Sequence, residues 1–184
     1  MVKKMMAISA VSLALLFAFW GIFLNTDKML YFSLGIVAMT VCYHFTIRLV
    51  IGCVYDYFLR NCVDYKRKWF TERSFEKKLY KTLRVKKWKD YVPTADESLF
   101  SLEKKTPKQI IMAGCQAEIV HETCAAAGLL AMFLAFPFGE FWVFFATSIL
   151  AALCDLVFVA IQRYNRPRLL RLMEKTRDKA KNNA

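Results

Sequence analysis

Apolar residues are gathered into four long runs, and a densely charged segment separates the second run from the third. A run of about 20 mostly apolar residues is long enough to cross the hydrocarbon core of a bilayer. The pattern therefore predicts an all-α, polytopic membrane protein that forms a single membrane domain over residues 1–184. The predicted spans are residues 5–24, 29–54, 110–136 and 141–161.

The first run could instead be the apolar centre of a secretory signal peptide, because Lys3 and Lys4 precede it. Its length of about 20 residues and the lack of a small-x-small cleavage site before Asn25 favour a retained span. We therefore expect this run to stay in the protein as its first membrane helix.

Basic residues are distributed unevenly among the loops that these spans define. Of the 27 Lys and Arg residues, 15 lie from Arg60 to Lys108 and 8 lie from Arg163 onward, whereas the loop after the first span has Lys28 alone. Basic loops stay in the cytoplasm. We therefore expect a multi-pass protein of the cell membrane with both termini, the loop at 59–108 and the basic tail at 163–184 in the cytoplasm.

The charged loop contains a predicted basic amphipathic helix at residues 71–92. Ser74 or Thr71 could cap its start, and Pro93 ends it. A basic amphipathic helix is typical of a segment that lies in the plane of the inner leaflet and binds anionic lipid. The apolar stripe consists of Phe75, Leu79 and Leu83 and, less regularly, Val85 and Trp88.

The basic side chains of this predicted helix admit a second interpretation. Lys86, Lys87 and Lys89 could bind the phosphates of a CoA thioester or the acidic surface of an acyl carrier protein. The chain has no Gly-rich phosphate loop and no dinucleotide fingerprint, so ATP-dependent and NAD-dependent enzymes are poor candidates. We expect no nucleic acid partner, and the oligomeric state stays open.

The third helix carries ionisable side chains in its first turns. It is predicted to begin at Thr106-Pro107, and its next turns hold Glu118, His121 and Glu122. Glu118 and His121 are three residues apart and share a helix face, so the carboxylate could orient the imidazole as a general base for a hydroxyl. The alternative is an interfacial helix end whose polar residues are simply solvated.

Two other helices are predicted to bring polar side chains to the same membrane depth. His44 and Arg48 lie near the inner end of the second span. A dense polar cluster follows the fourth span, and its uncharged members gain nothing from anionic lipid headgroups. The cluster consists of Gln162, Arg163, Tyr164, Asn165 and Arg166. We therefore predict a polar pocket at the inner leaflet that is shared by three helices.

The polar residues of the spans also admit metal binding or a cysteine nucleophile. Glu118 and His121 form one half of a di-iron bundle motif, but the chain has only two histidines and Asp155 stands alone in the fourth span, so no metal is expected. Cys124 could be a nucleophile activated by His121. The six cysteines form no C-x-x-C pair, and free thiols are expected. Arg48 could be a membrane anchor, or pair with Asp56 or a substrate carboxyl.

Several segments resemble a known family. WF followed by KKWKDYVP, then AEIVH, then QRYNRPRLLRLMEK occur in the order found in glycosyl-4,4'-diaponeurosporenoate acyltransferases. These are small membrane enzymes that esterify a fatty acyl group onto a sugar hydroxyl of a glycosylated lipid in carotenoid synthesis. The resemblance covers roughly Trp69 to Lys175. By position, it assigns the family's motifs to Ala117, Glu118 and His121, to Gln162 to Leu169, and to Lys87, Trp88 and Lys89.

These observations predict a membrane O-acyltransferase that moves a fatty acyl group from acyl-CoA or acyl carrier protein to a hydroxyl of a (glyco)lipid or other amphipathic acceptor, with no further cofactor. His121, oriented by Glu118, removes the proton of the acceptor. The groups that hold the substrates and stabilise the oxyanion are Gln162, Arg163, Tyr164, Asn165, Arg166, Arg48, His44, Lys87, Trp88 and Lys89. One competing hypothesis is a non-catalytic protein that binds an anionic headgroup or acts as a scaffold. Another is a small transporter, although the sequence shows no broken or repeated helices to support it.

Overall fold

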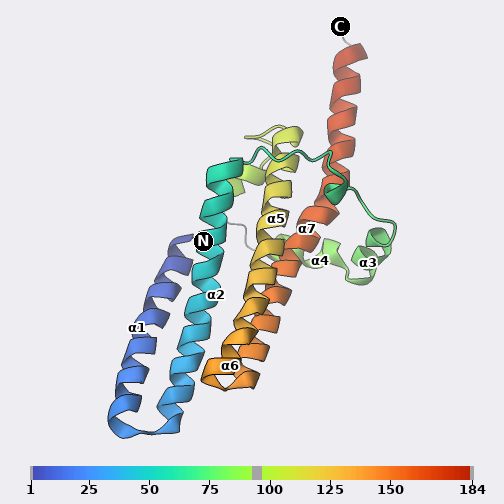
Figure 1. Cartoon of the computed structure of the whole chain (residues 1–184). Helices are drawn as coiled ribbons and strands as arrows, with labels where there is room; N and C mark the ends of the chain where they lie inside the picture. The colour runs from blue at the N-terminus through green and yellow to red at the C-terminus, as the bar shows by residue number, and fades with distance from the viewer. Residues whose placement is uncertain (1, 93–96, 183–184) are drawn as a thin grey trace. The chain divides into compact units, whose positions relative to one another are not determined.

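A computed structural model of the protein describes residues 2–92 and 97–182, and within them it contains helices and turns but no strand (Figure 1). Four helical segments are long and apolar enough to cross a membrane, which confirms the all-α, polytopic class. The long helices are α1 (Val2–Thr26), α2 (Met29–Leu59), α5 (Pro107–Leu130) and α7 (Phe141–Asn182).

The chain divides into two compact units. The first unit consists of Met1–Val54 and Glu122–Asp155, and the second consists of Tyr55–His121 and Leu156–Ala184. Helices α2, α5 and α7 each contribute residues to both units.

In the first unit, α1 packs closely against α2 (Figure 1). A Cβ atom placed on Gly35 lies 3.8 Å from a side-chain atom of Phe19 and 3.8 Å from one of Trp20. Farther along the pair, the hydroxyl groups of Thr46 and Ser9 are 3.3 Å apart and share a hydrogen bond. Most other apolar side chains of α1 are exposed, as expected for a helix that faces lipid.

The third apolar segment is not one continuous α-helix. Helix α5 ends at Leu130, a 3-10 helix follows at Ala131–Leu134, and α6 occupies Ala135–Phe138. Gly139 then has a φ of 71°, in the left-handed region that glycine adopts without a steric penalty, and the chain reverses into α7.

In the second unit, α5 begins at Pro107 as predicted. The Gln109 N–H donates to the Thr106 hydroxyl at 3.3 Å, and the Thr106 N–H donates to Gln109 Oε1 at 2.9 Å. This reciprocal pair is a capping box, which satisfies backbone groups that the first helical turn leaves without partners. Proline suits the first helical position because it has no N–H to satisfy.

Helix α7 does not end at the polar cluster that follows Ile161, but continues to Asn182 with Pro167 inside it. The basic tail that begins at Arg163 is therefore helical. A Cβ atom placed on Gly114 of α5 lies only 3.0 Å from Gln162 Oε1. Gln162 thus packs against the backbone of α5, which gives this uncharged polar residue a role other than contact with lipid headgroups.

The prediction of one amphipathic helix at residues 71–92 is wrong. The segment forms α3 (Glu76–Thr82), α4 (Val85–Trp88) and a 3-10 helix at Lys89–Tyr91. Arg84 separates α3 from α4, because its φ of 51° is left-handed and cannot continue a right-handed helix.

The predicted caps of this segment are also absent. The residue before α3 is Phe75, which makes no capping hydrogen bond, so neither Ser74 nor Thr71 caps the helix. The predicted stop at Pro93 lies outside the described residues. Two further 3-10 helices, Lys68–Phe70 and Glu97–Phe100, complete the loop.

Candidate active site

Glu118 lies at the centre of a buried set of ion pairs in the second unit. Its side chain on α5 is fully buried, with 0% exposure. Arg166 of α7 donates a hydrogen bond to Glu118 Oε2, and Arg163 Nε lies 2.8 Å from Glu118 Oε1. Because the two arginines are three residues apart on one helix, both can reach the same carboxylate.

The same arginines bind the cytosolic loop. Arg163 Nη1 donates to Glu76 Oε1 of α3 at 2.6 Å, and Arg163 Nη2 donates to the Trp69 carbonyl at 3.0 Å. Arg166 Nη1 donates to the Phe70 carbonyl at 3.0 Å, and its guanidinium lies over the Phe70 ring. Polar contacts therefore hold the loop against α7.

The two glutamates balance the charge of the two arginines. We call Glu76, Glu118, Arg163 and Arg166 the ion-pair network. Removing one member leaves a buried charge without compensation, which is strongly destabilising. Glu76 was not predicted as a site residue, because 87 positions separate it from Arg163 and no local spacing links them.

Tyr164, which was predicted to bind substrate, has aromatic and cationic neighbours. Its ring meets the ring of Tyr80 edge to face, with centroids 6.1 Å apart, and the Arg168 guanidinium lies 4.1 Å from its centroid. Burial raises the pKa of the Tyr80 hydroxyl, and the nearby Glu76 carboxylate raises it further. Tyr80 is thus kept neutral beside the ion-pair network.

His121 is half-buried on α5 and stacks on Phe158 of α7. The ring centroids are 4.5 Å apart and the ring planes differ by 6°. This contact fixes the plane of the imidazole. The predicted orienting partner of His121 was Glu118. Phe158 was not predicted, since spacing along α5 says nothing about residues on α7.

A cavity of about 740 Å³ lies beside the ion-pair network, and Arg163, Arg166 and Glu76 contribute to its lining. The rings of Tyr65 and Phe70 line it as well. The volume lies within the roughly 300–1,000 Å³ of typical small-molecule sites. This cavity, called the network cavity below, is large enough for the polar head of a substrate.

The glycosyl-4,4'-diaponeurosporenoate acyltransferase family matches residues 66–175, a range that includes the ion-pair network, His121 and the polar cluster after Ile161. The chain belongs to this family. It is an acyltransferase-type enzyme with several membrane-spanning helices. No curated protein and no solved structure is similar enough to match the chain.

In this acyltransferase, His44 and Arg48 belong to the first unit. Arg48 forms an ion pair with Asp155, a partner that was not predicted for it. Arg48 also donates to the carbonyl of Ala151 at 3.0 Å and to that of His44 at 2.7 Å. The pocket predicted to combine these residues with Glu118 and His121 stays a prediction, because Glu118 and His121 belong to the second unit.

The basic tryptophan motif of the acyltransferase lies on the surface of the second unit. Lys87 is exposed, Trp88 Nε1 donates to the Leu83 carbonyl at 2.9 Å, and Lys89 pairs with Asp90 at 2.6 Å. Lys87, Trp88 and Lys89 are not part of the lining of the network cavity. Their predicted contact with substrate remains a prediction.

The cysteines of the acyltransferase are free thiols. Cys124 is only 2% exposed, which disfavours its alternative role as a nucleophile because a nucleophile must reach its substrate. Within residues 2–92 and 97–182, no group of three or more His, Cys, Asp and Glu side chains is arranged to hold a metal ion.

Proposed function

We propose that the protein transfers a fatty acyl group from a thioester donor to a hydroxyl of a glycolipid or other amphipathic acceptor at the inner leaflet. The observation that carries the reaction class is the family match, which covers the segment with His121 and the ion-pair network. The donor is acyl-CoA or an acyl carrier protein, and no other cofactor is required.

In the proposed reaction, His121 acts as the general base. It takes the proton of the acceptor hydroxyl while the hydroxyl oxygen attacks the thioester carbonyl. The new C–O bond forms, the C–S bond breaks, and the proton passes from His121 to the departing thiolate. The stacking of His121 on Phe158 supports this role, because a base must hold a fixed direction toward the proton it removes.

The ion-pair network supports the same reaction by fixing two guanidinium groups. Donors held in place before the reaction stabilise a developing oxyanion better than mobile ones. Glu118 and Glu76 hold Arg163, and Glu118 together with the Phe70 carbonyl holds Arg166. In this proposal Glu118 has two roles: it positions Arg163 and Arg166, and it orients the imidazole of His121.

The network cavity is the proposed place for the polar head of the acceptor. Its lining contains carboxylates such as Glu72 and Glu76 as well as basic groups and the rings of Tyr65 and Phe70. Carboxylates accept hydrogen bonds from hydroxyl groups, and guanidinium groups donate to them. A neutral, hydroxyl-rich group such as a sugar fits this mixed lining better than a polyanion does.

The proposed topology places both termini and the loop at 59–108 in the cytoplasm. The uneven placement of Lys and Arg supports this orientation. A cytoplasmic loop would let soluble acyl-CoA or acyl carrier protein reach the second unit.

The function is tested by acyl transfer in membranes that contain the protein. Labelled acyl-CoA and labelled acyl carrier protein are supplied separately with glycolipid acceptors, and the lipids are read by mass spectrometry. The intact protein should produce a labelled acylated lipid, and His121→Ala should reduce its formation by roughly 100-fold or more. Size-exclusion chromatography and thermal unfolding check that the variant is folded.

Two outcomes would count against this proposal in different ways. A His121→Ala protein with full activity would end the role of His121 as the base. Folded wild-type protein that transfers from neither donor to any acceptor would favour a protein that only binds an anionic lipid headgroup.

A further inference from the structure

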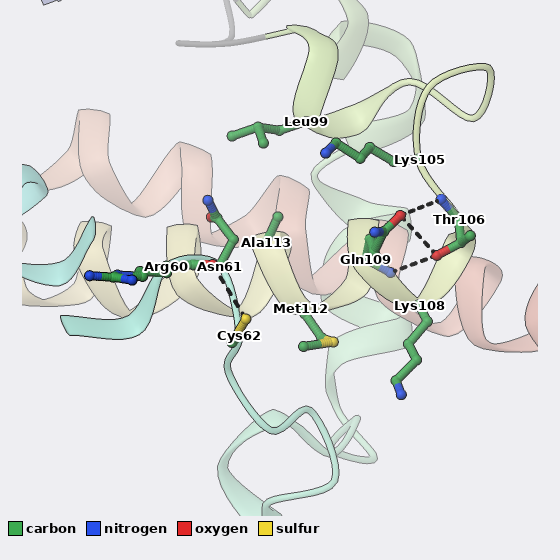
Figure 2. A pocket seen from close by; sticks show the side chains of 10 residues that line it. All are labelled: Arg60, Asn61, Cys62, Leu99, Lys105, Thr106, Lys108, Gln109, Met112 and Ala113. Carbon is green, nitrogen blue, oxygen red and sulfur yellow. Dashed lines mark hydrogen bonds between the residues drawn. The ribbon is translucent and has the colours of Figure 1, made fainter. Parts of the chain in front are cut away.

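A second cavity in the second unit has a different electrostatic character (Figure 2). Its volume is about 540 Å³, and it is lined by the basic residues Arg60, Lys105 and Lys108, while none of the acidic side chains that the structure describes lines it. The network cavity, in contrast, has carboxylates among its lining residues. We call the second space the basic cavity.

The three basic side chains come from three short segments that meet at the start of α5. Arg60 lies in the turn after α2, Lys105 in the loop before α5 and Lys108 in the first turn of α5 (Figure 2). Among the side chains that the structure describes, no carboxylate forms an ion pair with Arg60, Lys105 or Lys108. In this part of the chain they differ from Arg163 and Arg166, which are paired with glutamates.

The backbone on both sides of the basic cavity is fixed. Arg60 and Asn61 have φ values of 45° and 57°, in the left-handed region, and form a tight turn. The Asn61 N–H donates to Gln116 Oε1 of α5 at 2.7 Å, which holds this turn against the helix. The capping box of Thr106 and Gln109 fixes the backbone between Lys105 and Lys108.

The side chains can adapt to a ligand although their backbone is fixed. Arg60 and Lys108 are exposed and Lys105 is half-buried, so their long side chains can turn onto a bound anion. The N-terminus of α5 adds partial positive charge at the same place. Leu99 and Met112 give the cavity an apolar wall.

We infer that the basic cavity binds a phosphate group, and that the acyl donor supplies it. Lysine and arginine are the side chains that proteins use for phosphate, and the cavity has three of them with no carboxylate among its described lining residues. The phosphates of CoA, or of the phosphopantetheine arm of a carrier protein, would lie here while the thioester reaches the acceptor. The identity of the donor rests on the proposed function, whereas the anion site does not.

The first test measures binding of CoA without any acyl transfer. Full-length protein is placed in phosphatidylcholine nanodiscs, and its affinities for CoA, dephospho-CoA and pantetheine are measured by isothermal titration calorimetry. CoA should bind best, dephospho-CoA less well and pantetheine least, because the phosphates are removed in that order. The affinity for CoA should also fall as the salt concentration rises.

A charge-matched pair of variants tests the location. Arg60→Gln combined with Lys105→Gln and Lys108→Gln should weaken CoA binding by about tenfold or more, since hydrogen bonds to charged groups are lost. The control removes equal charge from exposed residues outside both cavities. It combines Lys68→Gln, Lys78→Gln and Lys81→Gln, and CoA binding should stay within about twofold of the wild-type value.

A second measurement needs no variant and remains informative if the triple variant does not fold. Wild-type protein is treated with an amine-acylating reagent, and modification of each lysine is read by mass spectrometry. CoA should protect Lys105 and Lys108 but leave Lys78 and Lys81 unprotected. Equal modification of Lys105 and Lys108 with and without CoA would contradict binding of the donor in this cavity.

A lipid headgroup also carries a phosphate, so a separate experiment distinguishes a bound lipid from bound CoA. Nanodiscs that contain phosphatidylglycerol are compared with phosphatidylcholine nanodiscs, and native mass spectrometry reads the retained lipid. Retention of phosphatidylglycerol that the triple variant abolishes, without CoA binding, would keep the phosphate site but replace the donor by a lipid. If neither ligand depends on the three basic residues, the inference is wrong even where acyl transfer is observed.

Discussion

Glu118 on α5 and Arg166 on α7 form an ion pair in which the two residues are 0% and 5% exposed. Arg163 joins the same carboxylate and extends the contact to Glu76 in α3. The two glutamates balance the two arginines, so a single substitution leaves an uncompensated charge in a site with little access to water.

The first prediction concerns the stability of this pair. Glu118→Gln should lower the free energy of unfolding of the second unit by about 3–5 kcal/mol, because two buried guanidinium groups lose their shared carboxylate. Thermal unfolding in detergent, compared between wild type and variant, measures the loss. Glu174→Gln, on an exposed position of α7, is the control and should change the midpoint little.

A double substitution separates charge compensation from a general packing defect. Glu118→Gln combined with Arg166→Gln should be more stable than the sum of the two single effects predicts, since the second change removes part of the uncompensated charge. Strictly additive effects would show that the two side chains do not stabilise each other.

The second prediction concerns the position of His121. Phe158→Leu removes the aromatic face 4.5 Å from the imidazole but keeps an apolar side chain of similar size. We expect the turnover rate to fall by roughly tenfold, with little change in the thermal midpoint, because a misdirected base transfers protons less well. Phe158→Tyr, which retains the stacked ring, should keep most of the rate. Equal rates for Phe158→Leu and wild type would show that the stacking does not position the base.

The sequence predicted those parts of the structure that depend on local pattern. Apolar run length indicated the membrane helices, and Thr106-Pro107 indicated the start of α5. The prediction of one helix over residues 71–92 was wrong at Arg84, where a left-handed residue interrupts the chain between Leu83 and Val85. Arginine has no preference for the left-handed conformation, so the residue type at position 84 does not predict a break in the helix there.

The partners of the candidate site residues were harder to predict. Arg48 and Asp155 are 107 positions apart, and the pairing of Glu118 with Arg166 spans 48. Spacing rules apply within one helix and give no register between helices. Glu118 and Arg166 were therefore recognised as polar residues at one depth, but their direct contact was not.

The third prediction concerns the ion pair of Arg48 and Asp155 within the first unit. Asp155→Leu should destabilise the protein by about 3–5 kcal/mol, because it leaves Arg48 charged in an apolar segment. Arg48→Met with Asp155→Leu should recover much of that loss. Thermal unfolding and acyl transfer are measured together. A stable but inactive double variant would support the predicted contact of Arg48 with substrate, whereas an active one would show that the pair is structural.

The fourth prediction concerns alkaline pH. Burial, followed by the Glu76 carboxylate, raises the pKa of Tyr80 in the folded protein. Above a pH of about 10, the unfolded chain releases the tyrosine proton while the folded protein retains it, so this group's contribution to stability is full below that pH and decreases as pH rises. Chemical unfolding at a series of pH values should show a smaller alkaline loss for Tyr80→Phe. Identical slopes for both proteins would contradict the shift.

The last prediction concerns the exposed apolar face of α3 and the residues that flank it. Phe75, Leu79 and Leu83 are 56%, 42% and 49% exposed, while Glu76 of the same helix is buried and binds Arg163. We expect this apolar face to enter the headgroup region, because apolar side chains beside basic ones favour the surface of an anionic membrane. Replacing all three by serine should speed tryptic cleavage of the loop in anionic nanodiscs.

Salt concentration distinguishes the apolar and electrostatic parts of this membrane contact. The acceleration of cleavage by the serine substitutions, relative to the wild type, should depend little on salt, because the contact that they remove is apolar. Lys86→Glu with Lys87→Glu should also speed cleavage, but mainly at low salt, since screening weakens the attraction to anionic lipid over about 10 Å at 0.1 M. Detergent-solubilised protein provides the reference, and each rate in nanodiscs is divided by the rate of the same protein in detergent, because Lys86→Glu with Lys87→Glu removes two tryptic sites. If the serine variant and the wild type are cleaved equally fast in nanodiscs, the apolar face of α3 does not contact the bilayer, and another surface must hold the loop near the acceptor.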